Sequence, residues 1–221
     1  MDKKKKVILI SVAIIILAIV VGTVIFINSQ KSNNQNTEEL QNTKTSQLYN
    51  KILEAKEIIV TQALYDNNKT TIAIKDDNGY KEVVSDGSVE KYIVKNGDTY
   101  YIDESNKKYY RYQSNDMILT EIKEQFEDLY EKPVTKGKEK VNGKTYNYEE
   151  ITGYQDFLIN EELSVNNLEY AKTRLYYDNE NLVYIKTIVG ENEEIIKVNI
   201  SYNVNDDYFN IPEDYTDGRN D

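Results

Sequence analysis

The stretch TTIAIKDDNGYKEVVSDGSVEKYIVKNGDTYYID, residues 70–103, decides the fold class of this 221-residue chain. Apolar and polar residues alternate along it, and this period of two predicts strands at 70–75, 79–84, 89–94 and 99–103. The breaks at Asn78-Gly79, Asp86-Gly87 and Asn96-Gly97 suit the positive φ angles of tight hairpin turns. The strands are therefore predicted to pair in sequence order as an antiparallel meander.

The same pattern extends in both directions from this stretch. It predicts strands at 59–65, 108–112, 134–141 and 144–151, and final strands around 182–188 and 194–202. Further turns are expected at Asn67-Asn68, at Asn142-Gly143, and at residues 178–181 and 190–192. Residues 153–168 fit either a loop or a short helix lying over the sheet.

Two amphipathic helices accompany the strands. The first has Ser46 as a candidate N-cap and is indicated by apolar residues at helical spacing: Leu48, Ile52, Ala55 and Ile59. The second covers residues 116–131, where an apolar stripe opposes a charged face and Pro133 follows the end. The resulting prediction is an α+β fold: an N-terminal transmembrane helix, then a curved antiparallel sheet that forms a half-barrel of about ten or eleven strands packed on two or three helices.

The transmembrane helix is predicted at residues 7–27, from Val7 through Leu17 to Ile27, a run without a charged residue. About 20 apolar residues span the hydrocarbon core of a bilayer. A cleaved signal peptide is the alternative, but the run is long and lacks a small-x-small cleavage site. The run is preceded by a basic cluster. Its members are Lys3, Lys4, Lys5 and Lys6.

The positive-inside rule places this cluster in the cytoplasm and the remainder of the chain outside the cell membrane, as a single-pass protein. The predicted segments are a basic stub at 1–6, the anchor at 7–27, a flexible linker at 28–45, an extracytoplasmic domain at 46–215 and a disordered tail at 216–221. Abundant Lys, Asn, Ile and Tyr suggest an AT-rich bacterial genome.

The composition excludes several kinds of chemistry. The chain has no histidine, cysteine or tryptophan, so it has no thiolate nucleophile, Ser-His-Asp triad or Cys/His zinc site. Its net charge of −11 disfavours nucleic acid as a partner. The acidic clusters 76–79 and 178–181 lack the spacing of a calcium loop and are interpreted as turns. No metal, cofactor or catalytic residue is predicted.

Three local sequences carry a family resemblance: GKEKVNGKTY at 137–146, LYYD at 175–178 leading into LVYI at 182–185, and FNIPEDY at 209–215. With the order of elements, they resemble the LolA-like and LppX/LprG-like lipoprotein-carrier superfamily, in a membrane-anchored Gram-positive form. The resemblance implies an unclosed barrel whose concave face, covered by helices, holds acyl chains. Gram-positive members are commonly anchored through a lipidated cysteine, which this chain lacks, and a fixed anchor argues against a shuttling carrier.

These observations lead to two hypotheses of function. The first is a non-enzymatic, membrane-anchored extracytoplasmic domain that binds a lipid or another apolar ligand; the second is a structural or sensing module of the cell envelope that binds a protein partner. The twenty tyrosines are interpreted as strand formers rather than as a glycan-binding surface. Candidate residues for a ligand cavity, which equally fit a filled core, are Ile72, Ile74, Ile118, Ile122, Phe126, Leu175, Ile196 and Val198.

Overall fold

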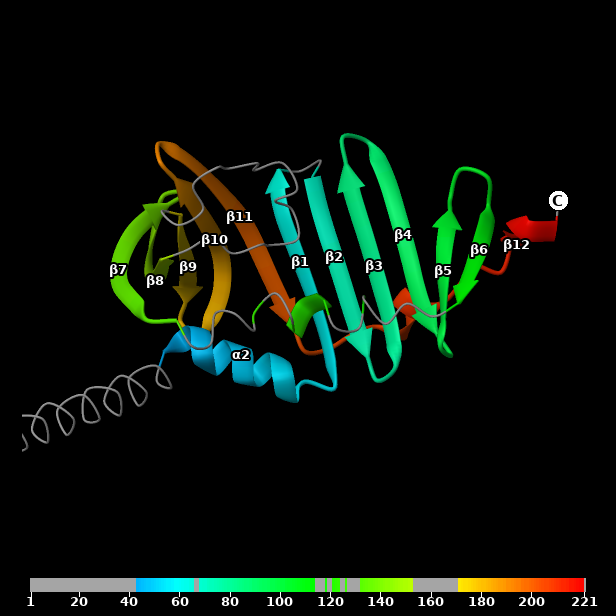
Figure 1. The fold of residues 1–221 in the computed structure, drawn as a ribbon, viewed down its shortest axis with the longest axis horizontal. Helices are drawn as coiled ribbons and strands as arrows, with labels where there is room; N and C mark the ends of the chain where they lie inside the picture. Colours follow the sequence, from blue (N-terminus) through cyan, green and yellow to red (C-terminus); the bar gives the residue numbers. More distant parts are fainter. Residues whose placement is uncertain are drawn as a thin grey trace, which may run out of the picture. The chain divides into compact units, whose positions relative to one another are not determined.

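The alternating segments form the strands of one large sheet (Figure 1). The computed structural model describes residues 43–65, 68–113, 118, 121–123, 126, 132–152 and 171–220. Its strands are β1 (Glu57–Tyr65), β2 (Asn68–Lys75), β3 (Asn78–Ser85), β4 (Ser88–Lys95), β5 (Asp98–Asp103), β6 (Lys108–Gln113), β7 (Val134–Val141), β8 (Lys144–Thr152), β9 (Lys172–Asp178), β10 (Asn181–Val189), β11 (Asn192–Ser201) and β12 (Thr216–Asp217).

Two meanders make up the sheet. In space the strands run β12-β6-β5-β4-β3-β2-β1-β11-β10-β9-β8-β7, so β1–β6 and β7–β11 each pair in sequence order and meet where β1 lies beside β11. All neighbours are antiparallel except β12, which is parallel to β6. The predicted meander pairing is therefore confirmed, and the junction of β1 with β11 is what unites the two halves.

The predicted fold class is nevertheless wrong. The sheet is open and has twelve strands rather than ten or eleven. Among the described residues it is accompanied by one eleven-residue α-helix, α2 (Lys44–Glu54), by a few helical residues within 118–126, and by 3-10 turns at Asp206–Phe209 and Gly218–Asn220. The strand missed at the C-terminus, β12, has two polar residues and so shows no apolar alternation. It lies in the tail that was predicted to be disordered.

The predicted location also needs correction. Within the part of the chain that the structure describes, no helix has the length and apolar character needed to span a bilayer. The predicted anchor at 7–27 and its flanking lysines fall outside those residues, as does most of the predicted linker. The expectation of a single-pass cell-membrane protein is contradicted on this finding.

Hairpin turns fix the register of the strands. Asp86-Gly87, Asn96-Gly97 and Asn142-Gly143 all have positive φ at both residues, which is the geometry that matches the twist of a two-residue hairpin. The turn predicted at Asn78-Gly79 lies two residues too late. Lys75 pairs with Asn78, so the two turn residues are Asp76 and Asp77. Asp76 has a φ of 52°, a backbone conformation that aspartate tolerates better than most residues do.

The helix α2 is held by the sheet at its N-terminus. Thr43, rather than the predicted Ser46, is the N-cap, and its hydroxyl accepts a hydrogen bond from the Ser46 amide. Glu149 of β8 reaches the same end: its carboxylate accepts from the amides of Lys44 (3.0 Å) and Thr45 (2.8 Å) and from the Thr45 hydroxyl (2.7 Å). These bonds satisfy N–H groups that have no partner within a helix, and they place a negative charge at the positive end of its dipole.

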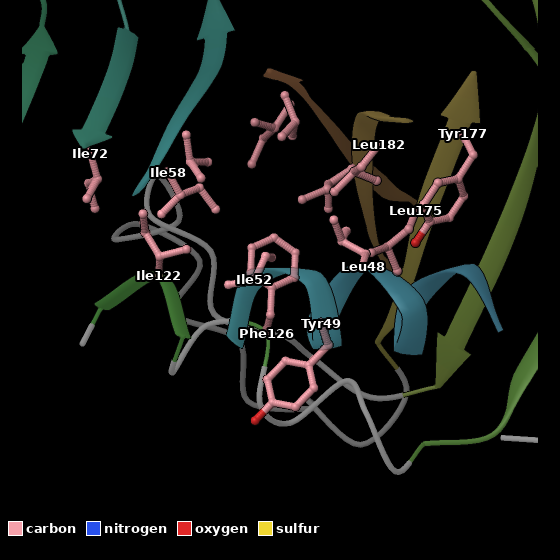
Figure 2. Packing of buried hydrophobic residues seen from close by; sticks show 14 of the residues in the cluster. Leu48, Tyr49, Ile52, Ile58, Ile72, Ile122, Phe126, Leu175, Tyr177 and Leu182 are labelled. Atoms are coloured by element: carbon pink, nitrogen blue, oxygen red, sulfur yellow. The ribbon is translucent and has the colours of Figure 1, made fainter. Parts of the chain in front are cut away.

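Each face of the sheet has its own core. On the inner face Leu48 and Ile52 of α2 point toward the strands, beside Ile122 and Phe126, as Figure 2 shows. The strand residues of this inner core are Ile58, Val60, Ile72, Val94, Ile151, Leu175, Tyr177, Leu182, Ile185, Ile196 and Val198. On the opposite, outer face the segment after β11 packs Val204 and Phe209 against Ala73, Tyr80, Ile93 and Ile102. Both faces of the first meander are therefore covered.

A network of charges occupies the outer face of the second meander. Glu139 of β7 accepts hydrogen bonds from Arg174 (2.7 Å), Tyr176 (2.7 Å) and Lys186 (2.9 Å). Burial alone would raise the pKa of Glu139, but these three donors outweigh it and lower the pKa to about 2. Arg174 also binds Glu150 at 2.7 Å. The network ties β7 to β9 and β10 across the intervening β8.

Replacing Glu149 with alanine should lower the free energy of unfolding by about 2–3 kcal/mol, because it leaves buried amides of α2 without acceptors. Urea denaturation followed by circular dichroism measures this. The matched control is Glu180→Gln, which alters an exposed partner of Lys44 and should change stability by less than about 0.5 kcal/mol. Equal effects of the two substitutions would contradict the role assigned to Glu149.

Glu139 should make the fold sensitive to acid. Its folded pKa lies below the ordinary value of 4.5, so its contribution to stability is complete above about pH 4.5 and is lost as the pH falls toward 2. The stability difference between the wild type and Glu139→Gln should accordingly shrink over that interval. Urea titrations at a series of pH values measure it, and a difference that stays constant from pH 6 to pH 2 would refute this assignment.

Candidate functional site

A seam opens in the sheet where β10 and β11 separate. The two strands pair from Val189 and Asn192 as far as Tyr184 and Lys197. Beyond that point β10 stays with β9, through an irregularity between Leu182 and Tyr184, while β11 stays with β1. The start of β10 and the end of β11 are therefore not paired with each other, although each is still paired with its other neighbour.

A cavity of about 500 Å³ lies at this seam on the inner face, beneath α2. Its apolar wall combines Leu48 of α2, Leu182 and Val183 of β10, and Val198 and Ile200 of β11. The polar residues that complete it are Lys44, Gln47, Lys51, Glu180, Asn181, Asn199 and Tyr202. A second hollow of about 580 Å³, which shares Val183, Val198 and Asn199, marks the same seam on the outer face.

Tyr202, one of the residues that line the inner cavity, has an unpaired hydroxyl. The Tyr202 oxygen is buried and has no hydrogen-bond partner among the described residues. Burial raises the pKa of Tyr202, so its hydroxyl keeps its proton at neutral pH and remains a donor. A buried donor without a partner carries a desolvation cost, which a ligand that supplies an acceptor would remove.

Two lysines stand at the rim of the cavity. Lys51 places its ammonium 4.2 Å from the centre of the Tyr202 ring, a cation–π contact. Lys44 binds Glu180 at 3.1 Å and the Asn179 carbonyl, so its charge is already matched. In the described part of the chain Lys51 has no carboxylate partner, which leaves its positive charge available at the mouth.

The structure gathers the predicted cavity residues in one place. Ile72, Ile118, Ile122, Phe126, Leu175, Ile196 and Val198 all belong to the inner core, and Ile74 is partly buried against it. Of these eight, Val198 also lines the cavity beneath α2. For all eight, contact with a ligand stays a prediction. The sequence did not point to Lys51, Leu182, Val183 or Tyr202, because the divergence of β10 from β11 has no local sequence signal.

The arrangement defines a class: an open, mostly antiparallel sheet with a cavity of mixed apolar and polar lining beneath a helix, at a seam between two meanders. Comparison with known proteins finds no matching family model and no matching curated protein. Solved structures do match. LprF from Mycobacterium bovis has 13% identity and a TM-score of 0.46, over 82% of this chain and 98% of that one.

Two further structures are similar. The lipoprotein LppX of Mycobacterium tuberculosis has 11% identity and a TM-score of 0.40, over 78% of this chain and 98% of that one. A LolA superfamily protein from Nitrosomonas europaea has 12% identity and a TM-score of 0.24, over 70% of this chain and 88% of that one. LppX and a LolA superfamily protein, the kinds of protein that the sequence resembles, are thus both among the similar structures. At these identities and TM-scores the likeness carries no argument about ligand, anchoring or activity.

Proposed function

We propose that this chain binds a lipid or another apolar ligand, without catalysis, in the cavity beneath α2. The observation that supports this most directly is a cavity that combines an apolar wall with Tyr202, whose buried hydroxyl has no partner among the described residues. Ligand sites typically have volumes of about 300–1,000 Å³ and combine an apolar lining with a few polar groups. The cavity of about 500 Å³ lies within this range of volume, and five of its lining residues are apolar.

The polar groups favour a ligand with an apolar tail and an acceptor-bearing head. The tail would contact Leu48, Leu182 and Ile200, while Tyr202 would donate to an oxygen of the head. Lys51, at the rim, adds attraction for a negative charge. The predicted domain at 46–215 is the proposed ligand-binding unit.

Filling the cavity should abolish binding. In Ile200→Trp the larger ring occupies the space beneath α2, so the affinity for a fluorescent fatty acid, titrated against the purified chain, should fall at least about tenfold. Val89→Trp adds the same ring at an exposed position of β4 and should bind like the wild type. Solvent extraction of the native protein followed by mass spectrometry provides an independent measurement. Unchanged binding by Ile200→Trp would exclude this cavity.

Tyr202→Phe should have opposite effects on binding and on stability. Removing an unpaired buried hydroxyl should leave the ligand-free protein as stable as the wild type, or more stable by about 1 kcal/mol. The affinity for the fluorescent fatty acid should fall about three- to tenfold, because the head loses a donor. Urea denaturation and the fluorescence titration measure the two effects. A hydroxyl that only supports the fold would give lower stability with unchanged affinity.

A further inference from the structure

The two edges of the open sheet differ. At one edge β12 pairs with β6, and the Thr216 amide donates to the Lys107 carbonyl at 3.1 Å. At the other edge β7 is the last strand, and no described strand pairs with its outer side. An edge strand presents a row of backbone donors and acceptors that can pair with another chain. Among the described strands, the first edge is thus covered and the second is open.

The register of the β7–β8 hairpin determines which residues face the open edge. Val141 and Lys144 flank the two-residue turn Asn142-Gly143 and form the pair that exchanges hydrogen bonds. Such pairs alternate along an antiparallel ladder, so the amides and carbonyls of Lys136, Lys138 and Lys140 point away from β8. The three lysines occupy alternate positions along β7, and their backbone N–H and C=O groups are available to pair with a further strand.

The side chains of the same three lysines share one face. Val134, which has the same parity, packs against the inner core, so Lys136, Lys138 and Lys140 continue along that face as an exposed lysine strip. Lys136 lies 3.9 Å from Glu149 and its side chain is 65% exposed. In the described part of the chain Lys138 and Lys140 have no carboxylate partner. On the other face of β7, Glu139 is fully engaged by its three donors.

We propose that the open edge of β7 binds an acidic, extended peptide segment of a partner protein as an additional strand. The backbone of the lysine strip would supply the ladder, and its ammonium groups would select acidic residues at alternate positions, which recur along a strand at the same spacing of about 6.6 Å. Opposite charges on neighbouring strands attract, and like charges repel. If β7 of a second copy paired with this edge, lysines would lie opposite lysines and repel each other. A second copy of this chain is therefore disfavoured as the partner at the β7 edge.

The net charge of −11 opposes an acidic ligand at long range. At physiological ionic strength, however, charges more than about 8 Å apart are largely screened, whereas contacts across neighbouring strands are shorter. The local strip therefore dominates once the peptide is docked. Lysines also protect edge strands from aggregation, and a purely protective strip would bind no peptide.

A labelled peptide of about eight residues with alternating Glu and Thr, within the usual length of a strand, tests the proposal by fluorescence anisotropy with the full chain. Saturable binding is expected, and K138E/K140E should weaken it at least about tenfold. The matched control K56E/K197E makes the same change of charge at exposed positions away from β7 and should leave affinity within about twofold. A peptide of alternating Lys and Thr should prefer K138E/K140E to the wild type.

The backbone contribution is tested separately by Lys138→Pro against Lys138→Ser. Both remove one ammonium group, but only proline removes the amide that faces the open edge, a position where edge strands tolerate proline. Lys138→Pro should bind the acidic peptide several-fold more weakly than Lys138→Ser. Equal affinities would overturn strand addition. Absence of saturable binding to the wild type, or equal binding to K138E/K140E, would overturn the acidic partner.

Discussion

The carboxylate of Glu149 at the N-terminus of α2 is the contact on which the inner face depends. An eleven-residue helix is too short to be stable by itself in water, so α2 exists because the sheet supports it. Glu149 orients the helix from β8, while Leu48 and Ile52 bury its apolar stripe over strands of both meanders. The helix thereby lies over the seam. Because the N-terminus of α2 is fixed, the helix forms one side of the cavity.

The cavity follows from the topology. β11 closes the second meander but also joins the first through β1, whereas β10 remains with β9. The pairing of β10 with β11 ends at Tyr184 and Lys197, next to the irregularity in β10 between Leu182 and Tyr184. Side chains from both strands and from α2 surround the resulting space. An opening that arises where two meanders meet can persist without weakening the hairpins on either side.

Much of this fold could be predicted from local sequence. Hairpins such as Asp86-Gly87 and Asn96-Gly97 set strand pairing over a few residues, and their turns admit few alternatives. The pairing of β1 with β11 joins Ile59 to Ser201, a long-range contact with no local signal. Likewise, Glu149 as a distant partner of α2 and Tyr202 as an unpaired donor depend on that pairing. The inner core could be identified by periodicity, but the place where it opens could not.

The lysine strip at the open edge of β7 has two effects: it disfavours pairing with a second copy of the chain, and it favours pairing with an acidic strand. A twelve-stranded sheet that does not close must keep its last strand from pairing with other copies. Lysine side chains achieve this because two identical strips repel each other. The repulsion is selective, however, since it acts on cationic strands and not on acidic ones. Glu139 alternates with these lysines, so its side chain lies on the opposite face of β7, where it binds Arg174 and Lys186. The charge that prevents self-association therefore also defines which strand the edge can accept.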